Sequence, residues 1–129
     1  MKFSANKLKA SFGYAWSGIS NAFRSEQNLR IHCSISIVAI AAAAVLDFSV
    51  WRYCVLFLVI ASVLSLELMN TAIENAVDLT TDDIHPLAKK AKDAAAGAVL
   101  VFSLFAVIIG ILLFFQPAVE MIKQWNAGR

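Results

Sequence analysis

The feature that most constrains this chain is a run of 26 residues, 94–119, that contains no formally charged side chain. A helix that crosses a hydrocarbon core about 30 Å thick needs about 20 such residues, because each adds about 1.5 Å along the axis. Two shorter uncharged runs precede it, at 31–46 and 53–66. Only 16% of the residues are charged and 60% are hydrophobic, whereas soluble domains have about 25% charged residues. The sequence therefore predicts an integral membrane protein.

Residues at the ends of the two short runs allow both to be extended into full spans. Arg30 and Arg52 can extend their stems towards lipid headgroups. Trp51 and Tyr53 are side chains of the kind that collect at the membrane interface. Pro117 is expected to end the last span, because proline has no N–H for the helical ladder. We predict an all-α fold with three transmembrane helices, at about 29–47, 50–69 and 95–116.

An amphipathic segment at about 4–24 precedes the spans. Its apolar residues recur at helical spacing on one narrow face, while its polar residues lie mostly opposite. The segment is too polar to span a bilayer, so we expect it to lie in the headgroup plane. An ordinary amphipathic helix packed on protein is the alternative. The apolar residues are Leu8, Phe12, Trp16, Ile19 and Phe23.

Basic residues divide unequally between the two sides that these spans create. Eight Lys and Arg residues lie in the N-terminal segment and the 79–93 loop, against three on the opposite side. The positive-inside rule places the N-terminus and this loop in the cytoplasm. We expect no cleaved signal peptide and a single domain over 1–129. The net charge of +2 gives no indication of a nucleic-acid partner.

Four polar side chains share one face of the second span. They are Glu67, Asn70, Glu74 and Asp78. Separations of three and four residues place them within roughly 100° of arc on a helix. Measured from Trp51, Glu67 lies about 24 Å along the helix and Glu74 about 35 Å, so the first is submerged and the second is near the headgroups. Acids at such depth usually mark a functional site; the alternative is a set of structural contacts between helices.

Further charged residues are expected at the same membrane surface. Lys92 and Asp93 adjoin the start of the third span, and an ammonium beside a carboxylate suits a phosphate with a hard cation. Such a pair is also common at helix ends. Glu26 precedes the first span and could join Glu74 in holding Mg²⁺, which prefers oxygen ligands; alone, it would be a solvated loop acid.

The histidines and cysteines indicate no further chemistry. We interpret His32 as a polar residue at the membrane boundary and His85 as a loop residue before Pro86, and neither as a catalytic base. Cys33 and Cys54 lie in apolar runs and act as small hydrophobic residues. The chain has neither a GxxxxGK[ST] loop nor a kinase-type glycine-rich loop. Any use of ATP must therefore rely on a different arrangement.

Two motifs carry a resemblance to a known family. The segment 67–78, ELMNTAIENAVD, followed by AKD at 91–93, is similar to the signature of the small prokaryotic diacylglycerol kinases. The run HPLAKKAKDAAAGAV at 85–99 is more similar to their undecaprenol kinase branch. The resemblance covers roughly 7–116. It implies a homotrimer in a bacterial plasma membrane, with active sites between neighbouring subunits.

The resemblance also implies roles for individual residues. Glu67 matches the proposed general base and contacts the lipid, and Trp16 borders the lipid site. Glu26 and Glu74 match the metal-binding carboxylates for Mg²⁺. The residues implied to bind ATP are Tyr14, Asn70, Glu74, Asp78, His85, Lys92 and Asp93.

These residues together predict a lipid kinase that transfers the γ-phosphate of Mg-ATP to undecaprenol. The depth of Glu67 fits proton acceptance, because partial burial disfavours the ionised form of a carboxylate. A diacylglycerol kinase that makes phosphatidic acid is the alternative, since both substrates are long-chain alcohols. A small oligomeric transporter is a further one, but it requires acids near the midplane and a continuous polar path. A membrane scaffold without chemistry is the last.

Overall fold

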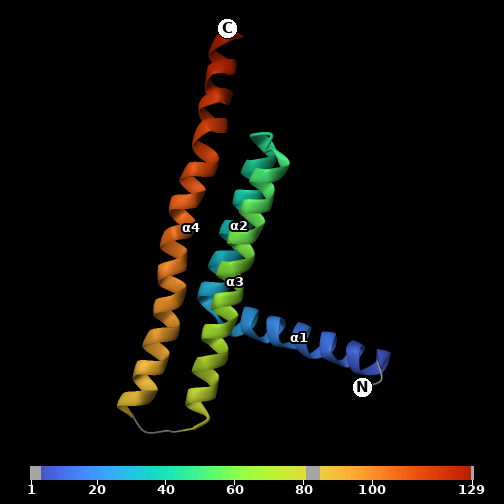
Figure 1. Ribbon diagram of the computed structural model, residues 1–129, viewed down its shortest axis with the longest axis vertical. Helices are drawn as coiled ribbons and strands as arrows, with labels where there is room; N and C mark the ends of the chain where they lie inside the picture. Colours follow the sequence, from blue (N-terminus) through green and yellow to red (C-terminus); the bar gives the residue numbers. More distant parts are fainter. Residues whose placement is uncertain (1–3, 81–84, 129) are drawn as a thin grey trace.

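The computed structural model describes residues 4–80 and 85–128, which form four helices and no strand. The helices α2 and α3 form an antiparallel hairpin, and α4 runs beside α3 (Figure 1). The first helix, α1, extends sideways from this bundle. The all-α prediction is confirmed for the described ranges. The helices are α1 (Ala5–Ser25), α2 (Gln27–Val45), α3 (Val50–Asp78) and α4 (Pro86–Ala127).

Three of these helices, α2, α3 and α4, are long and apolar enough to cross a membrane. With 29 and 42 residues, α3 and α4 are about 43 Å and 63 Å long, more than a hydrocarbon core of about 30 Å. Both must project beyond it. Large apolar side chains such as Ile37 and Leu112 are exposed along the helices, which suits surfaces that contact lipid or further subunits.

The last helix does not end at Pro117. α4 continues through this buried residue to Ala127, so the prediction of a helix end there is wrong. Proline removes one ladder hydrogen bond, but side chains on both sides of it are connected. Gln116 Nε2 donates to Glu120 Oε1 (2.8 Å) and Gln116 Oε1 accepts from Arg52 Nη2 (2.9 Å). These contacts stabilise the helix across the proline.

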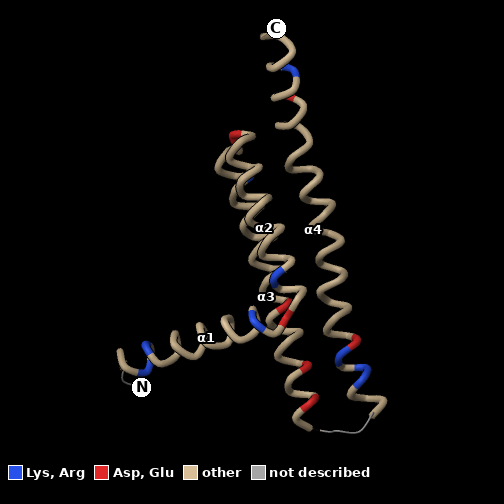
Figure 2. Tube along the Cα trace, turned by 180° about the vertical axis from the view of Figure 1, so that it is seen from behind, with Lys and Arg blue, Asp and Glu red and all other residues tan. Residues whose placement is uncertain are grey.

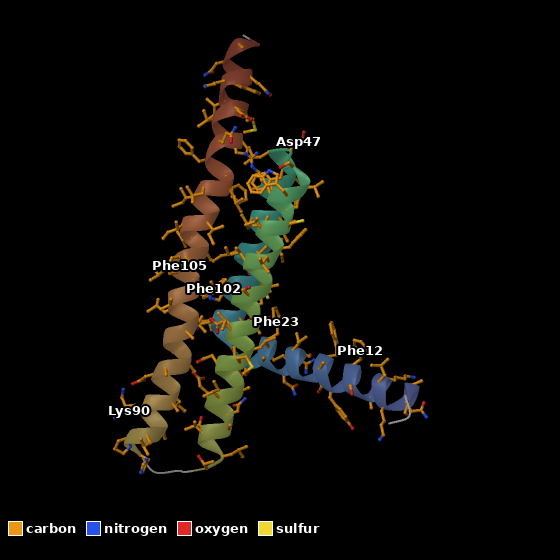
Figure 3. The ribbon with its side chains drawn as sticks, viewed as in Figure 1. Phe12, Phe23, Asp47, Lys90, Phe102 and Phe105 are labelled. Atoms are coloured by element: carbon orange, nitrogen blue, oxygen red, sulfur yellow. The ribbon has the colours of Figure 1, made fainter. Side chains whose placement is uncertain are left out.

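The turn between α2 and α3 is fixed by a left-handed residue, Asp47, with φ of 48°. The N–H of Asp47 donates to the Ala44 carbonyl (3.3 Å), and that of Phe48 donates to the Ala43 carbonyl (3.1 Å). This pattern is a Schellman motif, in which glycine usually takes the left-handed position and aspartate is tolerated. Asp47 lies at one end of the bundle and Lys90 near the other (Figure 3).

The buried core of the bundle lies next to this turn. Ala43, Phe48, Leu56 and Leu113 come from α2, the turn, α3 and α4, and they form one buried cluster. The rings of Phe48 and Phe114 have their centroids 4.6 Å apart. Packing of apolar side chains therefore holds the three long helices together at the end opposite the polar stripe.

The junction between α1 and α2 is held by hydrogen bonds from Arg30. Its Nη1 donates to the carbonyls of Phe23 (3.2 Å) and Arg24 (2.8 Å), in the last turn of α1. A cation is favourable there, because the unpaired carbonyls carry partial negative charge. Arg30 thus caps α1 and connects it to the start of α2; its extension towards lipid headgroups stays a prediction.

The apolar face of α1 is not covered by the bundle. Phe12 and Trp16 are both largely exposed, and Phe12 lies well away from the other helices (Figure 3). The exposed face fits the predicted location in the headgroup plane, which stays a prediction. α3 continues past the level of α1 (Figure 1), so its last turns would then project beyond the headgroup plane.

Candidate functional site

The deepest member of the polar stripe, Glu67, has a partner on α2. Its side chain is only 4% exposed, and its Oε1 lies 3.1 Å from Nε2 of His32. The hydroxyl of Thr71 donates to the Glu67 backbone carbonyl (3.1 Å), a local bond within α3. Buried carboxylates are stable only when they are hydrogen-bonded or paired. His32 supplies that contact, which the sequence interpretation missed.

One turn further along α3, Asn70 and Glu74 are joined. Asn70 Nδ2 donates to Glu74 Oε1 (2.9 Å), as their spacing of four residues allows. The Oδ1 atom of Asn70 is buried without a hydrogen-bond partner. Buried polar atoms are normally paired. A free amide oxygen next to a carboxylate therefore fits a bound ligand, and oxygen atoms of these two kinds suit Mg²⁺.

The last residue of the stripe, Asp78, faces α4. Its Oδ1 lies 2.5 Å from Nζ of Lys92, and the two side chains are 64% and 35% exposed. Lys89 pairs with Asp93 one turn apart on α4. Acidic and basic residues accordingly face each other between the ends of α3 and α4 (Figure 2). Exposed pairs contribute only about 0–1 kcal/mol, so a phosphate can replace either carboxylate at little expense of stability.

Glu26, predicted to bind a metal, lies at the junction of α1 and α2. Its Oε1 accepts a hydrogen bond from Ser25 Oγ (2.9 Å), and no hydrogen bond in the described ranges joins it to Glu74. Within residues 4–80 and 85–128, no group of three or more His, Cys, Asp or Glu side chains could hold a metal ion. A magnesium ion here would need phosphate or water oxygens as further ligands, which is its usual behaviour in kinases.

A groove of about 560 Å³ separates α1 from α3. Small residues of α1, such as Gly18 and Ala22, face Thr71 and Asn75 of α3 across it. Tyr14 and Trp16, predicted at the nucleotide and lipid sites, are exposed on α1 and are not among its lining residues. The groove therefore lies beside the polar stripe, and its lining on α3 comes from residues next to the stripe, such as Thr71 and Asn75.

His85, predicted as a nucleotide contact, begins α4. Its Nδ1 accepts the N–H of Leu87 (3.2 Å), and Pro86 occupies the first helical position. His85 is favourable at this position because the first N–H groups of a helix need acceptors from outside the helix. Pro86 is favourable because proline has no N–H group that needs an acceptor. The contact uses one ring nitrogen of His85 for helix capping. Residues 81–84 lie outside the described residues.

The distribution of charge does not favour a transporter. On α3 no charged residue lies between Arg52 and Glu67, and on α4 none lies between Asp93 and Glu120. In Figure 2 α4 is uncharged between its two charged ends, and the part of α3 near the α2–α3 turn shows a long uncharged stretch. Proton and ion pathways usually need polar groups through the full thickness of the membrane. Asp78, Lys89, Lys92 and Asp93 instead lie at the end of the bundle where α3 and α4 come together.

Comparisons with known proteins identify the family of this chain. The model of the prokaryotic diacylglycerol kinase family matches residues 13–114. The undecaprenol kinase of Bacillus subtilis is 45% identical over 109 residues, which cover 84% of this chain and 89% of that protein. The diacylglycerol kinase of Synechocystis is 45% identical over 118 residues, covering 91% and 67%. That of Escherichia coli K12 is 31% identical over 109 residues, covering 84% and 88%. The chain therefore belongs to the prokaryotic diacylglycerol kinase family and is a lipid kinase.

Proposed function

We propose that this lipid kinase transfers the γ-phosphoryl group of Mg-ATP to undecaprenol. The observation that carries the proposal is the polar stripe on α3, whose side chains become more exposed from Glu67 to Asp78. It begins with the buried Glu67, continues with the joined pair Asn70 and Glu74, and ends at Asp78 beside Lys92. A proton acceptor, oxygen ligands and a cation for phosphate thus follow one another from the membrane interior outwards. Phosphoryl transfer needs this combination of positioning and charge compensation.

In the proposed reaction Glu67 acts as the general base. The alcohol oxygen forms a bond to the γ-phosphorus while the bond from that phosphorus to the bridging oxygen breaks, and ADP leaves with its electron pair. Glu67 takes the proton of the alcohol, which raises the nucleophilicity of the oxygen at the moment of attack. Low exposure keeps water away from the carboxylate, so that a lipid alcohol is the favoured acceptor.

The nucleotide would bind along the outer part of the stripe. Glu74, with Glu26, would hold Mg²⁺, which when bound compensates phosphate charge. Asn70 would orient the ATP through its unpartnered Oδ1. Lys92 would exchange Asp78 for a phosphate oxygen, and Asp93 would lie beside it. Tyr14 and Trp16 on the open face of α1, together with His85, would border the nucleotide and the lipid.

The choice of undecaprenol has support from the sequence. The run 85–99 is similar to the undecaprenol kinase branch, and the Bacillus subtilis relative carries that name. Diacylglycerol is the second candidate, because the Synechocystis protein has equal identity and is named a diacylglycerol kinase. Both alcohols would reach Glu67 from the membrane.

We also propose a homotrimer in a bacterial plasma membrane with a cytoplasmic N-terminus. The exposed apolar side chains of α4 leave room for contacts with other subunits. The excess of basic residues near the α3–α4 connection supports the orientation.

Phosphate transfer by the chain in lipid nanodiscs tests the proposal. With labelled Mg-ATP, Glu67→Gln should lower turnover by about 10²–10⁴, the usual contribution of a positioned base, while Mg-ATP still binds. Glu74→Gln should abolish Mg²⁺-dependent ATP binding. Glu120→Gln is the matched control, since this acid is hydrogen-bonded to Gln116 near the other end of α4. Near-normal turnover of Glu67→Gln would refute the assignment of Glu67 as the base. Unchanged ATP affinity of Glu74→Gln would refute the assignment of Glu74 as a metal ligand.

A further inference from the structure

His32 and Glu67 form the one contact of the buried carboxylate with a titratable group in the described chain. The two residues come from different helices of the α2–α3 hairpin, and 3.1 Å separates Nε2 from Oε1. The imidazole is 24% exposed and the carboxylate only 4%. The histidine is therefore more accessible than the acid with which it is paired. A carboxylate has two oxygens, and this contact uses one of them.

His32 also borders a second, mostly apolar cavity. This cavity of about 280 Å³ lies among α2, α3 and α4, and Ile35, Val63 and Gly110 are among its lining residues. The hydroxyl of Ser103, another lining residue, is buried without a hydrogen-bond partner. The apolar interior of the bundle thus meets the polar stripe at the imidazole of His32.

We propose that His32 is a positioning residue for phosphoryl transfer: its Nε2–H donates to Oε1 of Glu67 and so holds Oε2 ready for the alcohol proton. The inference rests on the proposed role of Glu67 as the base. A free carboxylate on a flexible glutamate side chain can rotate about its terminal bonds. One directed hydrogen bond to Oε1 restricts that rotation. Alignment of this kind strongly affects rate, because reacting atoms must lie within about 3–3.5 Å in the right orientation.

The alternative for His32 is a structural contact that only compensates a buried charge. The two roles make different predictions. A structural contact affects folding and leaves the kinetics of the folded protein unchanged. A positioning contact affects kcat of the folded protein, leaves the KM for Mg-ATP unchanged because the nucleotide binds elsewhere on the stripe, and depends on where the donor lies.

Two amide substitutions separate these roles. In His32→Gln the side-chain N–H can reach the place of Nε2, whereas in His32→Asn the amide is too short and corresponds to Nδ1. His32→Phe keeps the ring and removes the donor. Ser34→Ala is the control on the same helix, since the Ser34 hydroxyl is exposed and donates to the Arg30 carbonyl. We would measure kcat, the KM for Mg-ATP and the thermal midpoint of each variant in the same nanodiscs.

We expect His32→Phe to lower kcat about 10- to 150-fold, the factor for a hydrogen bond to a charged group, at constant KM for Mg-ATP. His32→Gln should recover most of the loss and His32→Asn should not. If His32→Phe fails to fold, the comparison of the two amides remains decisive. Equal kcat for His32→Gln and His32→Asn would overturn the proposal, as would a normal kcat for His32→Phe.

The Glu67→Gln background distinguishes this inference from the proposed function. If Glu67 is the base and His32 acts through it, His32→Phe should produce no further loss in that background. A full additional loss there would contradict action through Glu67. An inactive Glu67→Gln with a normal His32→Phe would overturn the positioning role alone, whereas an active Glu67→Gln would overturn the base assignment itself.

Discussion

The contact between Lys92 and Asp78 allows the nucleotide site to be tested quantitatively. Lys92 bridges from α4 to the end of α3, with its ammonium 2.5 Å from the Asp78 carboxylate. Binding of ATP would require the ammonium to turn from this carboxylate to a phosphate. Asp78→Asn removes the competitor, and Lys92→Met removes the cation while keeping the length of the side chain.

The exposure of the pair sets the expected sizes. With side chains 64% and 35% exposed, the ion pair contributes about 0.2–1 kcal/mol, so Asp78→Asn should change Mg-ATP affinity by less than about 5-fold. A hydrogen bond between the Lys92 ammonium and phosphate contributes about 1.5–3 kcal/mol. Lys92→Met should therefore weaken Mg-ATP binding about 10- to 150-fold.

Calorimetric titration of Mg-ATP into each variant measures both effects. Lys90→Met is the control, since Lys90 is an exposed lysine of the same helix end, and its affinity should match the wild type. An Asp78→Asn variant as weak as Lys92→Met would show that Asp78 itself contacts the nucleotide. Wild-type affinity in Lys92→Met would refute the assignment of this lysine to phosphate.

Three predictions concern the scaffold; unfolding in mixed micelles measures the first two, and limited proteolysis measures the third. Asp47→Gly should stabilise the protein by about 1 kcal/mol, because glycine avoids the penalty of the left-handed turn position; a loss of stability would contradict the strain. Phe48→Ala should destabilise it by about 3–5 kcal/mol through the buried cluster, and the exposed Phe115→Ala should have a much smaller effect. Arg30→Met should increase proteolysis at the α1–α2 junction by removing the cap of α1; an unchanged cleavage rate would show that the cap is dispensable.

The sequence was sufficient to predict the helices and the stripe, because both depend on local patterns. Uncharged runs of 14 or more residues marked the spans, and three- and four-residue spacing placed Glu67 and Glu74 on one face. The predicted helix end at Pro117 was wrong. The local rule that proline ends a helix does not hold here, because contacts of Gln116 with Arg52 and Glu120 stabilise the helix across the proline. The contact with Arg52 could not be predicted locally, because Arg52 is far from Gln116 in the sequence.

The contact of His32 with Glu67 could not be predicted in the same way. It depends on the register of the α2–α3 hairpin, which the Schellman turn at Asp47 and the packing of Phe48 determine. The pairing of Lys92 with Asp78 likewise depends on how α4 lies against α3. The capping role of His85 did have a local signal, since Pro86 directly follows it and proline is favoured at the first helical position.

The most direct test of the central claim is the ratio of kcat/KM for undecaprenol and diacylglycerol, measured with Mg-ATP in one bilayer composition. The account predicts transfer of the γ-phosphate to undecaprenol with the higher kcat/KM, and loss of transfer to both lipids in Glu67→Gln. A higher kcat/KM for diacylglycerol would contradict the assignment of the lipid. Absence of transfer to either alcohol by the folded wild-type protein would contradict the proposed reaction.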